Sequence, residues 1–198
     1  MANADAAFGL RPVGDLSGSP YTGGTVKCVI AAGDGTATFV GDPVKLSGTG
    51  ITGTDGATYP TVIQGVMNAA FFGVITSFDP NPDNLTLQYR AASTERRCNV
   101  VPALPNQLYA VQVDGAFALT SIGLKIDLVD AGSSALQAGS TTTGYSGVEA
   151  DSSAIASTEA NLLILGFYNA PDNDIASDNS IIIVRLDESS LFSGGTEV

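Results

Sequence analysis

The sequence predicts an all-β protein: a sandwich or barrel with a jelly-roll-like body, an extended N-terminal arm and little helix. From Thr25 onward, short apolar segments alternate with turn-forming residues, a pattern typical of β-sandwiches and β-barrels. Glycine occurs 23 times and proline 9 times in 198 residues, and both interrupt helical periodicity along the whole chain. We expect three parts: an arm at 1–24, a single β-rich domain at 25–188 and a C-terminal tail at 189–198.

The arm is apolar but has no regular period. Closely spaced glycines and prolines separate its large side chains, so neither helix nor strand is expected there. These side chains are Phe8, Leu10, Val13, Leu16 and Tyr21. Because such a segment cannot bury itself alone, we expect it to lie extended in a groove of its own body or of a neighbour, in preference to a free terminus. Deleting residues 2–20 is then expected to abolish partner binding or oligomerisation and to leave the β body folded.

The body is expected to start with a strand at 26–30, where Val26, Cys28 and Ile30 alternate with their neighbours, followed by a turn at 33–35. Residues 47–60, rich in Gly and Thr, are expected to form a loop. Residues 79–84, with two prolines, are expected to form a rigid turn. The other expected strands are 36–40, 43–46, 61–67, 71–78, 85–91, 108–113, 117–120, 122–129, 162–168 and 181–186. One helix is expected at 151–160, where Asp151 offers a cap.

Composition excludes several classes of function. The chain has no histidine and two cysteines, which rules out His-dependent catalysis, histidine metal sites and four-thiolate zinc sites. A formal net charge of −12 would repel phosphate backbones, so we expect no nucleic-acid partner. We also expect no membrane contact, because no apolar stretch reaches the ~20 residues that cross a bilayer. With no secretory signal visible, Cys28 and Cys98 are expected to be buried thiols, with a disulfide between them as the alternative.

Charge is distributed unevenly. Residues 1–126 hold 9 acidic and 7 basic side chains, whereas residues 127–198 hold 11 acidic side chains and one basic. We interpret the C-terminal third as a solvated acidic face, and alternatively as the face that points outward on an assembly. The basic cluster of Arg90, Arg96 and Arg97 has three interpretations. In order of preference they are exposed charges at strand ends, partners for acids of a neighbouring chain, and a phosphate site.

Motifs that suggest ligands lack the context they require. Residues 48–53 match G-x-G-x-x-G, but no helix follows to bind a pyrophosphate, so no cofactor is expected. Asp79, Asn81 and Asp83 have the spacing of calcium ligands, and Asp172 and Asp174 repeat part of it. Both segments lack the glycine and the glutamate of an EF-hand loop, so no metal site is expected. No pair of carboxylates stands out for acid–base catalysis, and we do not expect an enzyme.

Several colinear segments resemble a family of tailed-bacteriophage head proteins. The first is Met1-Ala-Asn-Ala-Asp-Ala-Ala-Phe-Gly-Leu-Arg-Pro-Val13. The others are Gly41-Asp42-Pro43-Val44, Gln88-Tyr89-Arg90-Ala91-Ala92-Ser93-Thr94, Leu108-Tyr109-Ala110-Val111-Gln112-Val113, Leu163-Ile164-Leu165-Gly166 with Pro171-Asp172-Asn173, and Ile182-Ile183-Val184-Arg185. After the last strand, Asp187-Glu188-Ser189 stands where the family would have an Asn-Glu-His-like segment. The resemblance implies a capsid decoration, or cement, protein.

The expected function is therefore structural. The resemblance implies binding to the outer surface of the expanded capsid, bridging of neighbouring major capsid subunits, and a location in the virion after synthesis in the bacterial cytoplasm. It also implies self-association, with a homotrimer expected and a dimer as the alternative. We expect contacts through Phe8, Leu10, Arg11, Val13, Leu16, Tyr21, Arg90, Arg96 and Arg97. The alternatives are another virion component, such as a tail-tube or head-completion protein, and a host-surface or glycan-binding module.

Overall fold

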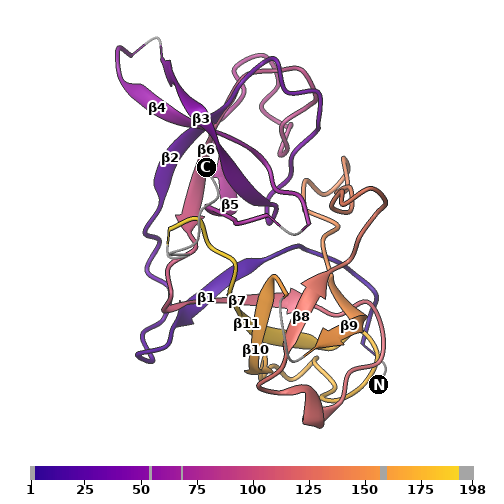
Figure 1. Cartoon of the computed structure of the whole chain (residues 1–198). Helices are drawn as coiled ribbons and strands as arrows, with labels where there is room; N and C mark the ends of the chain where they lie inside the picture. The colour runs from indigo at the N-terminus through magenta and orange to yellow at the C-terminus, as the bar shows by residue number, and fades with distance from the viewer. Residues whose placement is uncertain (1–2, 54, 68, 157–159, 192–198) are drawn as a thin grey trace.

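A computed structural model describes residues 3–53, 55–67, 69–156 and 160–191. Its regular structure over these residues is almost entirely β, which confirms the expected fold class (Figure 1). The strands are β1 (Arg11–Asp15), β2 (Val26–Ile30), β3 (Pro43–Thr52), β4 (Thr58–Gln64), β5 (Gly73–Phe78), β6 (Arg96–Pro102), β7 (Gln107–Gln112), β8 (Lys125–Leu128), β9 (Ala150–Ala156), β10 (Leu162–Phe167) and β11 (Ile181–Leu186). A single turn of 3-10 helix, η1 (Leu119–Ser121), precedes β8.

Two sheets pack as a sandwich-like body. Strands β2-β4-β3-β5-β6 close into a barrel, and the second sheet has the order β1-β7-β11-β10-β8-β9. The barrel is an insertion in the chain, because β1 and β7, which flank it in sequence, are antiparallel neighbours in the second sheet. In Figure 1 the barrel lies above the six-stranded sheet, and β1 runs along the edge of that sheet beside β7. The N-terminal strand therefore belongs to the same sheet as the C-terminal half.

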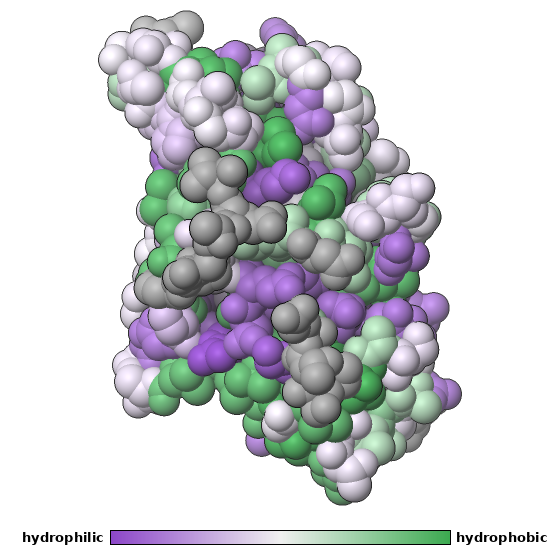
Figure 2. Space-filling view, viewed as in Figure 1, coloured by the Kyte–Doolittle hydropathy of each residue, from purple (hydrophilic) through white to green (hydrophobic). Residues whose placement is uncertain are grey.

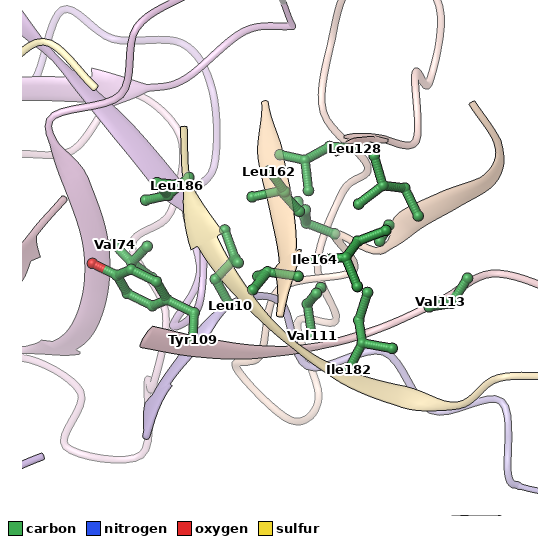
Figure 3. Packing of buried hydrophobic residues seen from close by; sticks show 14 of the residues in the cluster. Leu10, Val74, Tyr109, Val111, Val113, Leu128, Leu162, Ile164, Ile182 and Leu186 are labelled. Carbon is green, nitrogen blue, oxygen red and sulfur yellow. The ribbon is translucent and has the colours of Figure 1, made fainter. Parts of the chain in front are cut away.

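The alternating side chains of β5 and β6 join the two sheets. Ile75 and Val100 point into the barrel, where they pack in a cluster with Cys28 and Cys98. Val74 and Val101, next to them in the chain, join the larger core of the six-stranded sheet, where Figure 3 labels Val74. Because β5 and β6 of the barrel contribute side chains to both core clusters, the barrel and the sheet pack as one body.

The sequence predicted eight strands at or near their observed positions: 26–30, 43–46, 61–67, 71–78, 108–113, 122–129, 162–168 and 181–186. It missed β1 and β6. We did not predict β1 because Pro12 and Gly14 are both unfavourable in a strand. The pairing of β1 with β7 is irregular between these two residues. In β6, Cys98 and Val100 both face the barrel core, so alternation was present in the sequence.

Residues 47–60 were wrongly expected to be a loop. They form most of a β-hairpin in which β3 extends to Thr52 and β4 begins at Thr58. The hairpin is mostly exposed, so its polar side chains gave no apolar alternation. Threonine nevertheless suits a strand, because its β-branched side chain packs on a pleated surface. Here Thr52 and Thr58 lie opposite each other, with their hydroxyls 3.1 Å apart.

The helix expected at 151–160 was wrong over the residues that the structure describes. Residues 150–156 form the edge strand β9, which pairs with β8, and 157–159 lie outside the described residues. Asp151 does not cap a helix; its carboxylate accepts hydrogen bonds from the backbone and hydroxyl of Ser153. Serine and alanine in this segment have no strong preference that opposes pairing with a neighbouring strand.

Three further strand predictions were wrong. Residues 36–40 and 85–91 form no regular strand, although Thr38 and Arg90 make one isolated bridge. In the second segment, Asn84 folds the chain into a turn by accepting hydrogen bonds from Thr86. Residues 117–120 lead into η1. Of the expected tail, Ser189 and Ser190 hydrogen-bond to backbone carbonyls of the body, and residues 192–198 lie outside the described part.

Candidate functional site

Side chains of the body hold the start of the arm. The amide of Gln112, a buried residue of β7, accepts from the Ala6 N–H at 2.9 Å and donates to the Ala4 carbonyl at 2.8 Å. The side chain of Asn3 donates to the Asp174 and Asp178 carbonyls and accepts from the Asp174 N–H. Residues 3–6 are therefore attached to the body by hydrogen bonds that involve side chains, and not by the backbone–backbone hydrogen bonds of a paired strand. In the folded chain the arm thus occupies a groove of its own body.

The arm then crosses the barrel at a close backbone contact. The Leu10 N–H donates to the Gly41 carbonyl at 2.9 Å, and the Leu10 side chain is 1% exposed in the larger core. Gly41 has φ +98°, and a Cβ there would lie 2.4 Å from the Phe8 carbonyl oxygen. Only glycine allows this approach. Leu10 therefore acts as a core residue of its own chain and offers no surface to a partner in this fold.

The other expected arm contacts differ in accessibility. Val13 is half-buried in β1, and Tyr21 packs partly against the core. Leu16 is 53% exposed at the turn where the arm reverses. That turn is ordered by Asp15, whose carboxylate accepts from the Ser17 and Ser19 backbone N–H groups. Leu16 is thus a large apolar side chain held at the surface by a defined turn.

Beside this turn lies a groove of about 340 Å³ between the returning arm and residues 101–107. The exposed side chains of Val26 and Leu104 border it, with exposures of 38% and 40%. The Leu16 N–H donates to the Asn106 carbonyl at 2.9 Å, which holds Leu16 next to the same segment. We call this groove, bordered by Val26 and Leu104, together with the adjoining side chain of Leu16, the arm-return groove.

Arg90 is inside the protein. Its side chain is 0% exposed and donates to the carbonyls of Ala31, Asp34, Thr36 and Thr94. A carboxylate oxygen of Asp34 lies 3.8 Å away. Desolvation lowers the pKa of the guanidinium and the Asp34 charge partly opposes this, but an arginine remains charged at any ordinary pH. The expectation of an exposed strand-end charge was therefore wrong for Arg90, which binds loops of its own barrel.

The two other arginines of the cluster also have partners within the chain. Arg96 is half-buried and donates to the carbonyls of Asp79, Leu87 and Tyr89, with its guanidinium over the Phe78 ring. Arg97 makes a 3.0 Å ion pair with Asp55 and lies over the Tyr59 ring. Both residues come from the start of β6. The three arginines are close together in the sequence, but each one binds a different set of partners in the folded chain.

The expected buried thiols are confirmed. Cys28 and Cys98 face each other across β2 and β6, both are fully buried, and neither forms a disulfide. Burial raises the pKa of Cys28 to about 11 and raises that of Cys98 further. Both thiols are therefore protonated and unreactive at neutral pH.

The calcium-like segments have turn chemistry. Asp79 pairs with Lys27 at 3.0 Å, and Asn81 accepts a hydrogen bond from the Asp83 N–H. No group of three or more metal-ligating side chains that could hold an ion occurs among the described residues. Over the same residues, no helix has the length and apolar character to span a membrane.

Asp42 is a buried acid beside the arm crossing. It is fully buried, and its Oδ2 accepts from the Phe39 N–H at 2.9 Å and from the Gln64 amide at 3.0 Å. Desolvation is the main cause that raises its pKa from 3.8 to about 6. The folded protein therefore holds this proton more tightly than the unfolded chain. The stability that protonation contributes is present below about pH 4 and is lost as the pH rises to about 6.

Replacing Asp42 with Asn should therefore stabilise the fold in a pH-dependent way. At pH 8 we expect Asp42→Asn to gain up to about 3 kcal/mol over the natural chain, because the amide removes a buried charge. At pH 4 the difference should fall close to zero. Urea unfolding at both pH values measures it. Asp130→Asn, at an exposed site, is the matched control, and an equal effect of the two substitutions would contradict a buried charge at residue 42.

A second pocket lies where the arm meets the barrel. It has a volume of about 540 Å³ and is walled mainly by apolar side chains, including Phe8, Pro12 and Val40. Tyr21 and Tyr145 also line it, and Tyr145 is 51% exposed. Arg11, the first residue of β1, is exposed and contributes to the lining. The sequence singled out Arg11 among its contact residues, but it gave no sign of Tyr145.

Comparison with known proteins identifies no relative of this chain: no family model, no curated protein and no solved structure matches it.

Proposed function

We propose that this chain is a structural virion protein that binds the outer surface of an expanded phage capsid and bridges neighbouring major capsid subunits, so that it stabilises the head. The colinear segments that resemble head proteins support the proposal, from the opening Met1-Ala-Asn to the closing Ile182-Ile183-Val184-Arg185. A compact β body with a fixed arm suits such a role, because a pre-ordered contact surface loses little conformational entropy on binding.

The observation that carries the proposal is the arm-return groove. Val26 and Leu104 line this concave surface and Leu16 lies on the turn next to it, and all three side chains are more than one-third exposed. Apolar groups gathered in this way mark sites of protein contact more often than scattered exposed residues do. Hydrogen bonds within the turn and from Leu16 to Asn106 fix the position of Leu16 beside the groove. We assign the groove and the adjoining Leu16 side chain to the capsid contact.

The acidic surface charge and the many copies expected on one capsid also support the proposed function. The acidic C-terminal third includes the exposed carboxylates of Asp130, Asp172 and Asp178, which suit a surface that faces solvent. Figure 2 shows one face of the molecule, with hydrophilic residues across the middle between barrel and sheet and apolar residues toward its lower end. Many copies on one shell, each bridging two or more subunits, would turn modest contacts into strong avidity. We propose a homotrimer as the bound form.

Co-sedimentation with phage shells that lack the protein tests the function. We expect saturable binding to expanded shells and none to compact precursor shells. The variant Leu16→Asp/Leu104→Asp should bind about ten-fold more weakly or worse, because two charges would then be placed against an apolar partner surface. The matched control is Leu119→Asp/Ile122→Asp, which changes two exposed apolar residues outside the groove.

The outcomes separate the proposal from its alternatives. Equal binding by the groove variant and the natural chain would overturn the assignment of the groove. Binding to neither kind of shell would overturn decoration. Native mass would then identify rings or tubes of a tail or head-completion protein, and saturable sugar or cell binding would identify a host-surface module.

A further inference from the structure

The pocket of about 540 Å³ between the arm and the barrel combines mainly apolar walls with one positively charged side chain. Its volume lies within the range of ordinary ligand sites, which hold apolar walls and a few placed polar groups. Phe8 and Pro12 of the arm form one side, and Val40 with Ile75 of the barrel forms the other. The hydroxyl-bearing side chains Thr76 and Tyr145 also line it.

Among the described residues that line this pocket, Arg11 is the one that carries a charge. Its guanidinium carbon lies 4.8 Å from the centre of the Phe8 ring and 5.7 Å from that of Tyr168. Its backbone is fixed by pairing with Ala110 of β7. No carboxylate of the described residues makes an ion pair with it, although the chain has 20 acidic side chains. Phe8 lines this pocket and Tyr168 lines an adjoining one of about 260 Å³, so the two rings hold the guanidinium at the boundary between the two pockets.

The other arginines of the chain behave differently. Arg90 and Arg96 donate to backbone carbonyls, and Arg185 pairs with Asp187 at 2.6 Å. A guanidinium that is oriented by aromatic rings and unpaired matches a carboxylate, because its N–H groups can donate two parallel hydrogen bonds to the two carboxylate oxygens. A single cation favours a carboxylate over a phosphate, which usually binds several positive groups or backbone amides.

We propose that this pocket binds an apolar group that carries a carboxylate, presented by a partner protein as an aromatic or large aliphatic side chain next to an acidic residue. The apolar side chain would enter between the arm and Val40, and the carboxylate would meet Arg11 at the edge. The identity of the partner as a virion protein rests on the proposed function. The chemistry of the pocket does not, so it is tested without capsids.

The first experiment measures binding of two small probes to the full-length chain by NMR. The probes are 2-naphthylacetate and its neutral isostere 2-naphthylacetamide, titrated to several times a dissociation constant of about 1 mM. We expect the acid to shift the backbone amide signals of Arg11, Gly41 and Thr76, and to bind about five-fold or more tightly than the amide. Arg11→Gln should remove that preference, and Tyr145→Ala should weaken both probes.

Lys45→Gln is the matched control, because it removes one positive charge from a barrel residue that does not line the pocket. It should keep the preference for the acid. Equal binding of acid and amide by the natural chain would overturn carboxylate recognition. Shifts confined to other residues, or none, would overturn the pocket itself. If Lys45→Gln also lost the preference for the acid over the amide, that preference would come from long-range charge, and the role of Arg11 would be overturned.

A second pair of probes tests the source of the ligand. Acetyl-Phe-Asp-amide should bind with the same pocket shifts and more tightly than acetyl-Phe-Asn-amide. If the naphthyl acid binds and the peptide pair does not, the pocket takes free carboxylates and the peptide part of the proposal is wrong. Loss of capsid binding in the groove variant with intact probe binding, or the reverse, distinguishes failure of one proposal from failure of the other.

Discussion

Replacing Arg90 with Met should destabilise the protein by about 4 kcal/mol. The substitution leaves up to four carbonyl oxygens, those of Ala31, Asp34, Thr36 and Thr94, without their donors, and each buried unsatisfied group costs about 1–3 kcal/mol. It also leaves the Asp34 carboxylate without the nearby positive charge. Some of these carbonyls will accept hydrogen bonds from water in the variant. The loss in the free energy of unfolding is therefore smaller than the sum of the four separate costs. Urea unfolding with a constant m-value measures the loss.

Two variants define what Arg90 does. Arg90→Lys keeps the charge but has three donors on one nitrogen, so it should recover only part of the stability. Arg97→Met removes a partly exposed ion pair to Asp55 and should cost less than about 1 kcal/mol. A loss under 1 kcal/mol in Arg90→Met would show that the loops do not depend on this side chain. Equal losses in Arg90→Met and Arg97→Met would contradict the difference in burial.

Deleting residues 2–15 should prevent stable folding, whereas the sequence alone led us to expect that the β body stays folded when residues 2–20 are deleted. The deletion removes β1 from the edge of the six-stranded sheet and exposes the hydrogen-bonding groups of β7. It also removes Leu10 from the core, and Leu10→Ala alone should cost about 2–5 kcal/mol. We expect loss of cooperative thermal unfolding or aggregation of the shortened chain.

A shorter deletion is the matched control. Removing residues 2–7 takes away the bonds of Asn3 and the two bonds between Gln112 and the arm, but it keeps Leu10 and β1. This variant should fold and lose about 1–3 kcal/mol. If deletion of 2–15 gave a protein as stable as the shorter one, then β1 and Leu10 would contribute nothing to the fold, contrary to their burial and pairing. Amide hydrogen exchange in β7 measures this directly.

Sequence reasoning worked best where a strand has an apolar core on at least one side. The strands at 26–30 and 181–186 were placed because their buried side chains alternate or run continuously. It failed where pairing depends on a distant partner. Apart from Ile155, strand β9 consists of small and polar residues, and it forms by pairing with β8. The hairpin at 47–60 forms on the solvent side of the barrel, where no core face leaves a pattern in the sequence.

The candidate contact residues show the same limit. Sequence spacing made Arg90, Arg96 and Arg97 look like one basic cluster, but the fold directs them to different loops. It also made Leu10 and Leu16 look alike, although one is 1% and the other 53% exposed. Accessibility is a property of what surrounds a side chain, and those neighbours come from distant parts of the chain. Tyr145 joins the pocket beside Arg11 for the same reason.

Composition and local alternation were sufficient to predict the all-β class and the acidic excess of the C-terminal third. They also predicted that Cys28 and Cys98 are buried, but they left open whether the two form a disulfide. The three-dimensional fold was needed to show that the barrel is inserted between β1 and β7, that Leu10 of the arm belongs to the core, and that Arg90 is internal. Pairing and burial of this kind join residues far apart in the chain. Their free energy depends on the whole fold, and no local pattern encodes it.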